Sequence, residues 1–327
     1  MCDGPLVAVV IVHWGSPEMT MECTESVCAS RYRSLKTIVV DNCPERRLWQ
    51  QPSEIGDAIV YMPVATNTGY CGGNNLGIRR AQELGAKYVL LLNNDTIIDK
   101  SLIRNCVCYM EDQPEVAVIS PKVFFHQRPK HIYVAGGDLD VNTGEVSYIG
   151  WNERDVGQYE RERDITWAQG SALFARASVF ERVGLFDERL FCYGEDVDLS
   201  RRIILAGMRM IYYPKARVWH KCSSLEDKST GILATPLATY YIWRNKLFNF
   251  RRYIVERRAR GYCVFAFRFI WRFASFVLKH RRLDLCRAMV LGLVDAVAGR
   301  MGKRQYALFE VPVVRGQGMA KREGFRW

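Results

Sequence analysis

Asn93-Asn94-Asp95 directly follows the strongly apolar run Tyr88 to Leu92. A short apolar run bounded by turn-forming residues predicts a buried strand of a parallel sheet. Open α/β sheets bind ligands just beyond the carboxyl ends of their strands, and hard divalent cations often join a protein carboxylate to substrate phosphates. Asp95 is therefore a candidate cation ligand, although Asn-Asn-Asp is also good turn chemistry in which Asp95 would only cap the residues that follow.

Glu195 and Asp196 form a second acidic group, placed after Gly194 at the expected start of a helix. A positioned carboxylate can act as general base toward a hydroxyl group whose pKa lies far above 7. Adjacent residues at a helix start point in different directions, so only one of the two can face a reacting atom. The alternative is that these carboxylates, together with Asp198, only occupy a helix N-terminus, where negative charge is stabilised.

A glycine- and asparagine-rich segment, Asn67 to Asn75, precedes a helix that we expect over Leu76 to Leu84. Glycines at a helix entrance let backbone amides approach an anionic group, which the helix dipole helps to hold. The same residues also suit a tight loop that requires positive φ. The sequence leaves both interpretations open.

Two strands and a helix at the start of the chain are the elements that must position such groups. Apolar runs over residues 6–12 and 36–42 predict the strands, and Pro17 to Ser30 can form the helix between them. Together they make a β-α-β unit of ordinary length, which favours an α/β fold. Asp41 again lies at the end of a strand.

Later segments extend this order. They are Trp167 to Arg176, Val183 to Glu188, Phe191 to Arg202, Gly207, Tyr213-Pro214 and Val218-Trp219-His220. Together and in order, these segments resemble the inverting nucleotide-sugar glycosyltransferases of family 2, most nearly their rhamnosyltransferase-like branch. The resemblance runs from residue 6 to about 250, roughly three quarters of the chain. It implies a GT-A fold over residues 1–240, α/β with a Rossmann-like, mostly parallel sheet and flanking helices, followed by a helical C-terminal extension over 241–327.

The resemblance also implies catalytic and metal-binding roles. In that family the acidic motif is often Asp-x-Asp, whereas here Asp95 is the only carboxylate of the motif, so a weak or substrate-dependent metal site is expected. His220, beyond an expected strand from Arg209 to Tyr213 and its turn, would reach the same cation, Mn²⁺ or Mg²⁺. Asp196 would be the general base.

Binding of the donor is the third role that the resemblance implies. The expected donor-binding residues are His13, Gly15, Asp41, Asn67, Gly69, Gly73, Asn74, Asn94 and Arg244. Asp41 would accept a hydrogen bond from the pyrimidine ring, and Arg244 could meet the diphosphate when the site closes or be one more cation of a basic helix. Arg201 and Arg202 either balance the acidity of Glu195 and Asp196 or contact the diphosphate, and both possibilities stay open.

The expected activity is transfer of a sugar, best L-rhamnose from dTDP-rhamnose, to a hydroxyl of a glycan or lipid-linked saccharide, with inversion and by direct displacement. An alternative is a galactofuranosyl- or N-acetylhexosaminyltransferase that uses a UDP-sugar. A non-catalytic nucleotide-sugar or glycan-binding module is a further alternative. The joint presence of Asp95, Asp196 and His220 argues against it, because a pure binder needs no base.

Positive charge is concentrated in the C-terminal extension. The whole chain has 46 Lys and Arg against 35 Asp and Glu, a formal net charge of +11. Residues 240–327 hold 20 of the basic and 5 of the acidic residues, so their net charge is +15 and that of residues 1–239 is −4. The region is also rich in aromatic residues. On a helix, Arg268, Arg272 and Lys279 would form one basic stripe beside a broad apolar face.

Three functions compete for this extension. A membrane span is disfavoured, because the apolar stretch is short and carries arginines near its middle. Nucleic-acid binding is disfavoured, because no known binding module accompanies the charge. A pair of helices lying on an anionic membrane surface fits best, with Phe265, Phe269, Trp271 and Phe276 entering the headgroup layer. The alternative is a helical extension that packs on the enzyme or forms a homodimer.

Localisation is expected at the cytoplasmic face of the cell membrane. Residues 1–5 lack a basic region and the apolar run after them is too short for a signal peptide. The 11 cysteines show no paired metal-ligand spacing, which favours reduced thiols over a disulfide framework.

Overall fold

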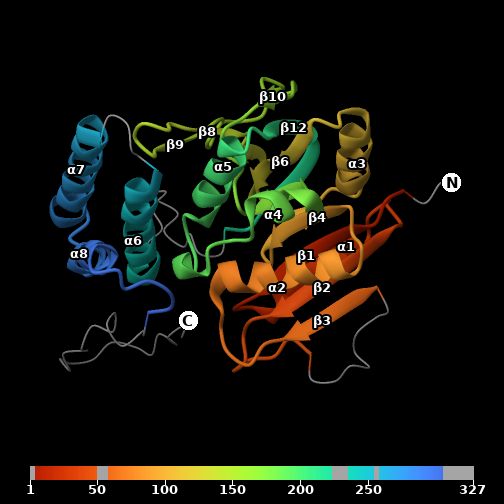
Figure 1. The fold of residues 1–327 in the computed structure, drawn as a ribbon, viewed down its shortest axis with the longest axis horizontal. Coiled ribbons are helices and arrows are strands. Elements are labelled where there is room, and N and C mark those ends of the chain that lie inside the picture. Colours follow the sequence, from red (N-terminus) through yellow and green to blue (C-terminus); the bar gives the residue numbers. More distant parts are fainter. Residues whose placement is uncertain (1–3, 50–57, 223–234, 254–257, 305–327) are drawn as a thin grey trace.

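The computed structural model describes residues 4–49, 58–222, 235–253 and 258–304 (Figure 1). The described strands are β1 (Val7–His13), β2 (Leu35–Asp41), β3 (Ile59–Pro63), β4 (Tyr88–Asn93), β5 (Thr96–Ile98), β6 (Val116–Phe125), β7 (Arg128–Val134), β8 (Gly137–Leu139), β9 (Val146–Tyr148), β10 (Arg163–Asp164), β11 (Ala172–Arg176) and β12 (Arg209–His220). The described helices are α1 (Pro17–Cys28), α2 (Gly69–Glu83), α3 (Leu102–Asp112), α4 (Ala177–Val183), α5 (Glu195–Leu205), α6 (Pro236–Tyr253), α7 (Arg258–Ala274) and α8 (Leu283–Val297). A 3₁₀ turn covers Glu188–Leu190, and a π-helical turn, Ser275–Lys279, continues α7.

A twisted sheet forms the centre of the molecule. Its strand order is β10-β12-β6-β11-β4-β1-β2-β3, with β5 added to β12 and β7 to β6, while β8 and β9 form a separate hairpin. Strands β3, β2, β1 and β4 are mutually parallel, as are β6 and β12, and β11 is antiparallel between the two groups. The expected mostly parallel α/β sheet is confirmed.

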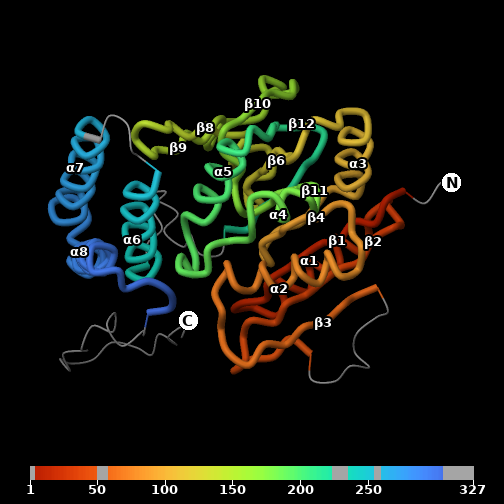
Figure 2. Tube along the Cα trace, in the orientation of Figure 1, coloured from red at the N-terminus to blue at the C-terminus, as the bar shows by residue number. Residues whose placement is uncertain are grey.

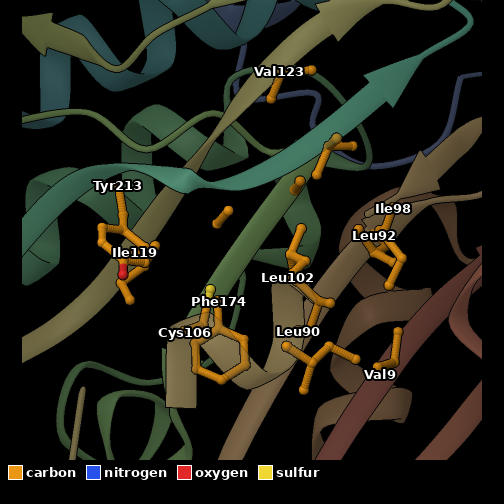
Figure 3. Packing of buried hydrophobic residues seen from close by; sticks show 14 of the residues in the cluster. Val9, Leu90, Leu92, Ile98, Leu102, Cys106, Ile119, Val123, Phe174 and Tyr213 are labelled. Carbon is orange, nitrogen blue, oxygen red and sulfur yellow. The ribbon is translucent and has the colours of Figure 1, made fainter. Parts of the chain in front are cut away.

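The sheet is buried on both faces, which explains why its strands are apolar along their whole length. All seven residues of β1 are buried, and alternate ones enter different clusters: Val9 on the face of α1 and α3, Val10 on the face of α2, α4 and α5. Figure 3 shows part of the first cluster, with Leu90 from β4 and Leu102 and Cys106 from α3.

Helix α2 begins at Gly69, so the expectation of a loop before a helix at Leu76 is wrong. A Cβ atom on Gly73 would lie 2.6 Å from Val12 Cγ1, and one on Gly77 would lie 2.2 Å from Val10 Cγ1. The glycines therefore let the helix lie directly on β1. Their main use is close packing of helix on strand, a requirement that the local sequence does not reveal.

Strand β12 also differs from the expectation that a strand ends at Tyr213. It continues to His220 across an irregularity in register between Tyr213 and Arg217. Such a β-bulge accommodates Pro214, which cannot donate to the ladder. His220 consequently lies at the end of β12, opposite Thr96 of β5.

The three C-terminal helices stand beside α5, at the edge of the molecule away from β1–β3 (Figures 1 and 2). They share an apolar cluster whose buried members are Trp243, Leu247, Phe250, Phe265, Phe276, Leu285, Cys286, Met289 and Ala296. The expected boundary between residues 240 and 241 falls inside α6, so the extension does not begin as a separate unit there.

Aromatic residues of α7 are divided between this cluster and the surface, which corrects the expectation for the membrane-facing set. Phe265 and Phe276 are buried, and Phe269 packs against Trp243 with ring centroids 5.3 Å apart. Trp271, in contrast, is 57% exposed. Among the described residues, one helical stretch, Ala259–Lys279, is long and apolar enough to cross a membrane by length and composition alone.

Candidate active site

Asp95 and His220 meet at the carboxyl end of the sheet. Asp95 follows β4, and the chain then forms β5, which pairs with β12 so that Thr96 lies opposite His220. Both side chains are buried, and Asp95 Oδ1 lies 3.0 Å from His220 Nε2. The sequence-predicted pair is therefore brought together by a short strand that the sequence analysis did not identify.

The charge of the Asp95–His220 pair depends on whether His220 carries a proton or a cation lies between the two side chains. Burial by itself would lower the pKa of His220, but the Asp95 carboxylate outweighs burial and raises that pKa to about 10. Two neighbouring ligands of an octahedral cation with bonds of about 2.1 Å lie about 3.0 Å apart, so the observed separation also suits a shared cation once His220 has lost its proton. No group of three or more His, Cys, Asp or Glu suited to a metal occurs among the described residues, so further ligands would come from substrate or water.

Asp196 and Glu195 open α5 in unequal environments. The Asp196 carboxylate accepts hydrogen bonds from the backbone N–H of Gly170 (3.3 Å) and of Val197 (2.8 Å). Glu195 is more deeply buried, and its Oε2 has no hydrogen-bond partner among the described residues. Burial raises the pKa of both carboxyl groups, and Asp196 also raises the pKa of Glu195. A single negative charge on the pair is best accommodated by Asp196, because only its carboxylate is hydrogen-bonded on both oxygens.

A short path of hydrogen bonds connects Asp196 to the strand that carries Asp95. The N–H of Asn93, the last residue of β4, donates to the carbonyl of Ser171 (2.9 Å). The adjacent Gly170 then donates to Asp196. The candidate base and the candidate cation ligand therefore share one edge of the sheet.

The turn before Glu195 has an unusual backbone. Phe191 and Tyr193 both have φ near 65°, which is uncommon for bulky residues and costs on the order of 1–3 kcal/mol each. Asn245 of α6 holds this turn: its Nδ2 lies 2.9, 2.8 and 2.6 Å from the carbonyl oxygens of Leu190, Cys192 and Tyr193. The sequence analysis did not identify this role of Asn245.

Arg244 shares in the same structural role, which corrects the expectation of a diphosphate contact. Its guanidinium is fully buried and donates to the carbonyls of Leu190 (2.8 Å), Arg189 (3.1 Å) and Gly302 (2.6 Å). Ring faces of Tyr240 and Tyr241 cover it. In this structure Arg244 is committed to backbone carbonyls and does not face a donor site.

Arg201 and Arg202, whose roles the sequence left open, differ in the structure. Arg202 balances acidity, because it forms an ion pair with Asp198 (2.8 Å). Asp198 also accepts from Arg252 and Tyr253 of α6, which ties α5 to the C-terminal helices. Arg201 takes no part in this network.

Asp41 lies at the end of β2, fully buried. Its carboxylate accepts from the backbone N–H of Cys43 (3.1 Å) and of Leu48 (2.9 Å) and from the hydroxyl of Tyr61. Asp41 therefore holds the segment after β2 in place. The same carboxylate would also have to accept the expected hydrogen bond from the pyrimidine ring.

Asn42, which the sequence analysis did not single out, connects that segment to α2. Its Oδ1 accepts from the backbone N–H of Thr68 (2.9 Å), and its Nδ2 donates to the carbonyl of Gly69 (2.9 Å) and to Asn67 Oδ1 (3.2 Å). Gly69 has φ of +73°, and a Cβ atom there would lie 2.4 Å from the carbonyl oxygen of Phe191. Asn67 and Gly69 are thus brought together, chiefly by contacts with the backbone.

His13 and Asn94 meet through Thr20, another residue that the sequence analysis missed. His13 Nδ1 lies 2.7 Å from Thr20 Oγ1, and Asn94 Nδ2 donates to the same oxygen (2.9 Å) and to the carbonyl of Trp14 (2.9 Å). Burial lowers the pKa of His13. A neutral imidazole is therefore held beside β4. Gly15, with φ of +85°, has open space where a Cβ atom would be.

The remaining predicted donor residues belong to α2. Asn74 is buried; its Nδ2 donates to the carbonyl of Tyr70 (2.9 Å), and its Oδ1 has no partner among the described residues. Gly73 packs on Val12, as described above. Asn74 therefore keeps an oxygen available to a ligand or to water, whereas Gly73 serves helix packing.

A row of aromatic rings borders the site and was not predicted. Ring centroids are 5.2 Å apart for His220 and Tyr133, 5.0 Å for Tyr133 and Trp151, 5.7 Å for Trp151 and Tyr148, and 4.8 Å for Tyr148 and Trp167. Burial raises the pKa of Tyr133, and neighbouring acids that include Asp95 and Asp196 raise it further. The row therefore adjoins both acidic groups, with Tyr148 and Trp151 partly exposed.

Comparisons with known proteins agree with this geometry. The family model described as "Glycosyltransferase like family 2" matches residues 4–234. The dTDP-rhamnosyl transferase RfbF of Shigella flexneri is 24% identical over 304 residues, which cover 92% of this chain and 98% of that protein. The N-acetylglucosaminyl-diphospho-decaprenol L-rhamnosyltransferase of Mycobacterium tuberculosis is 43% identical over 81 residues, 24% of this chain and 26% of that protein.

Among solved structures, the mannosyltransferase PcManGT of Pyrobaculum calidifontis, in complex with GDP-Man and Mn²⁺, has a similar fold. The TM-score is 0.54 at 13% identity, and the match covers 91% of this chain and 88% of that one. At such low identity the similarity establishes the GT-A fold alone.

Proposed function

Since the chain belongs to glycosyltransferase family 2, we propose that it transfers L-rhamnose from dTDP-rhamnose to a hydroxyl of a lipid-linked saccharide, with inversion. The observation that carries the proposal is the position of Asp196 beside the Asp95–His220 pair at one edge of the sheet. The rhamnosyltransferase names of similar proteins support the choice of sugar.

Asp196 would act as the general base. Its carboxylate would accept the proton of the acceptor hydroxyl while the hydroxyl oxygen forms a bond to the anomeric carbon of the donor. The bond from that carbon to the diphosphate oxygen breaks, and its electron pair leaves with the nucleotide diphosphate. The hydrogen bonds from Gly170 and Val197 orient the carboxylate for this task.

Asp95 and His220 would hold a divalent cation. When bound, the cation supplies charge neutralisation to the diphosphate leaving group. This cation site is supported by the 3.0 Å separation of Asp95 Oδ1 and His220 Nε2 and by the Mn²⁺ in the solved mannosyltransferase. A site with one carboxylate would bind the ion firmly only together with the donor.

The nucleotide would lie over the ends of β1 and β2. The expected contacts of Asp41 with the base, and of His13, Gly15 and Asn94 with the ribose or diphosphate, remain part of the proposal. Asn42, linked to Asn67, would act indirectly by holding the start of α2 in place.

A donor panel tests this function. The purified chain is incubated with dTDP-rhamnose, UDP-galactofuranose, UDP-N-acetylglucosamine and GDP-mannose, with Mn²⁺ or with EDTA, and product formation is measured with a lipid-linked saccharide acceptor. We expect transfer from dTDP-rhamnose, loss in EDTA and recovery with Mn²⁺. Turnover of a UDP-sugar instead would support the galactofuranosyl or N-acetylhexosaminyl alternative, and donor binding without transfer would support a binding module.

Two variants locate the metal site in the same assay. Asp95→Ala should lose the Mn²⁺-dependent part of dTDP binding, whereas Asp112→Ala, an exposed carboxylate on α3, should not. Equal metal dependence in both variants would contradict the assignment of Asp95.

The C-terminal helices would bind the cytoplasmic surface of the membrane. Exposed apolar side chains on and after α7 are Phe267 (68% exposed), Ile270 (65%), Trp271 (57%) and Leu278 (80%). Arg268 and Arg272 lie among them, so the surface combines apolar residues with positive charge, as interfacial helices do. A lipid-linked acceptor would then share this interface with the enzyme.

A further inference from the structure

A pocket beside the candidate base has no role in the chemistry described so far. Its volume is about 370 Å³, and its walls come from the β8–β9 hairpin, the start of α5, α6 and α7. Gly194 and Val197, which flank Glu195 and Asp196 in the chain, are among its lining residues. Arg272 lines the side formed by α7.

The pocket carries positive charge that the described residues do not neutralise. Arg201 forms no hydrogen bond or ion pair with any described residue, and its Nε is buried. Within the described part of the chain, Arg272 makes only ring contacts, with the faces of Trp271 and Phe276. The third cation, Lys246, is paired with Glu145 at 2.6 Å. Two partly buried arginines without acidic partners in the described ranges favour an anionic ligand, and a guanidinium suits phosphate oxygens in particular.

The other walls are apolar. Leu139 and Val146 from the hairpin and Ile242 and Phe250 from α6 face the same pocket. A free inorganic anion would gain nothing from these side chains. A phosphate ester with a hydrocarbon tail would use both parts of the lining, and the tail would continue toward the exposed apolar residues of α7.

Tyr148 connects the pocket to the base. It lines the pocket and belongs to the aromatic row that borders Asp196. Burial raises the pKa of Tyr148, and the charges of Asp196 and Glu195 raise it further. The Tyr148 hydroxyl therefore interacts electrostatically with both carboxylates. A saccharide attached to a phosphate in the pocket would pass over Tyr148 on its way to Asp196.

We propose that this pocket binds the phosphate group and the first lipid carbons of a lipid-linked acceptor, with Arg201 and Arg272 as the phosphate ligands. The proposal rests on the proposed function and adds the place where the acceptor is held. The phosphate fixes one end of the acceptor, and the hydroxyl to be glycosylated reaches Asp196 from the side of Tyr148.

The test compares acceptors that differ only in the phosphate. The full chain is assayed with one saccharide in two forms, joined to a short isoprenoid through a diphosphate or through a neutral glycosidic bond. We expect the diphosphate form to have at least a tenfold lower KM. Arg201→Gln and Arg272→Gln should each raise that KM about tenfold, as loss of one charge-assisted hydrogen bond would, and leave kcat and the KM of the neutral acceptor unchanged.

A matched control separates this effect from general loss of charge or fold. Arg104→Gln removes an exposed arginine on α3 that does not line the pocket. It should change neither KM. Arg201 and Arg272 lie on different helices, so a folding defect in one variant leaves the other to decide.

Direct binding distinguishes a lipid phosphate from a free anion. In EDTA, where a metal-dependent donor site is weakened, geranyl diphosphate should bind the wild-type chain more tightly than inorganic diphosphate, and Arg201→Gln should weaken the binding of geranyl diphosphate. Equal affinity for both would make the pocket a simple anion site and overturn the proposal, as would equal KM values for the two acceptors. Failure of transfer with every donor and acceptor would instead contradict the proposed function.

Discussion

At the scale of single residues, the proposed mechanism depends on Asp196. Replacement by Asn keeps the size of the side chain and removes the proton acceptor. We expect Asp196→Asn to lower kcat by about 10²-fold or more while the dissociation constant for dTDP-rhamnose stays within about twofold, because general-base assistance acts on the transition state. Stopped-time transfer assays and calorimetric donor binding measure the two quantities. Near wild-type turnover would remove Asp196 from the mechanism.

The pH dependence of transfer follows from the environment of the same residue. Burial raises the pKa of Asp196, so the rate should fall on the acid side at a higher pH than the ordinary aspartate value of about 3.9 would give. Burial also raises the pKa of Glu195, and the two carboxyl groups disfavour each other's ionisation. We expect Glu195→Gln to leave the acid limb of kcat/KM in place, because Asp196 ionises first, while Glu195 is still neutral.

Stability gives an independent measurement of the Glu195 environment. A carboxyl group whose pKa is raised on folding stabilises the protein at low pH, and this contribution is lost as pH rises through the folded-state pKa. The melting temperature of Glu195→Gln, relative to wild type, should therefore increase with pH. A constant difference in melting temperature across the pH range would show that the pKa of Glu195 is not raised on folding.

The three residues proposed for catalysis and metal binding could be singled out because they follow strand ends or open a helix, positions that the sequence marks with apolar runs and turns. Thr20, Asn42 and Asn245 were missed for one reason. Their partners are backbone groups or side chains distant in sequence, such as Leu190 for Asn245, and spacing along the chain does not reveal them.

At the scale of elements, α6 holds the turn that precedes α5. Asn245→Ala would leave the carbonyls of Cys192 and Tyr193 without their side-chain donor and that of Leu190 with Arg244 alone. It would also release Phe191 and Tyr193 from a backbone that costs energy to maintain. We expect a loss of about 1–3 kcal/mol in unfolding free energy. We also expect a fall in kcat larger than the rise in donor KM, because the displaced turn carries Asp196.

Asn105→Ala is the matched control for that variant. Asn105 also donates from a helix to a backbone carbonyl, that of Lys215 (2.9 Å), but lies away from the site. The Asn105→Ala variant should lose some unfolding free energy and keep the kcat of the wild type. If both variants lost kcat in proportion to stability, the turn would have no special influence on the base.

Elements with a strong apolar pattern were predictable, and those that depend on tertiary packing were not. The strands around Val7–His13 and Tyr88–Asn93 follow from their composition. The start of α2 and the continuation of β12 depend on Val12 below Gly73 and on the bulge after Tyr213. Gly and Pro discourage helix and strand locally, and packing overrides that preference here.

At the scale of the whole molecule, the membrane proposal predicts which apolar residues of α7 matter. We expect the full chain to cosediment with vesicles that contain anionic lipid, and high salt to weaken the association without abolishing it, since screening acts on charge and not on apolar burial. Phe267→Ser with Trp271→Ser should reduce binding at unchanged melting temperature. Phe265→Ser, in the buried cluster, should instead lower the melting temperature.

Analytical ultracentrifugation of the same proteins provides the opposing outcome. If the wild-type chain ignores vesicles but dimerises, and the Phe267 and Trp271 double variant is monomeric, the exposed face of α7 is a subunit interface. The membrane proposal would then be wrong.

The contact between Gly302 and the turn before α5 has a consequence for synthesis of the protein. Gly302 donates to the carbonyl of Arg189 (2.7 Å) and accepts from Arg244 (2.6 Å), and the N–H of Arg304 donates to Tyr241 (2.8 Å). At about 5–20 residues per second, a ribosome needs on the order of 5–20 s to travel from Asp196 to Gly302. During that interval the nascent chain holds its sheet and its acidic residues without the last bonds that fix them. These contacts form only after residue 304 has been made, so premature termination before residue 302 leaves every proposed catalytic residue present but the turn before Asp196 incompletely held.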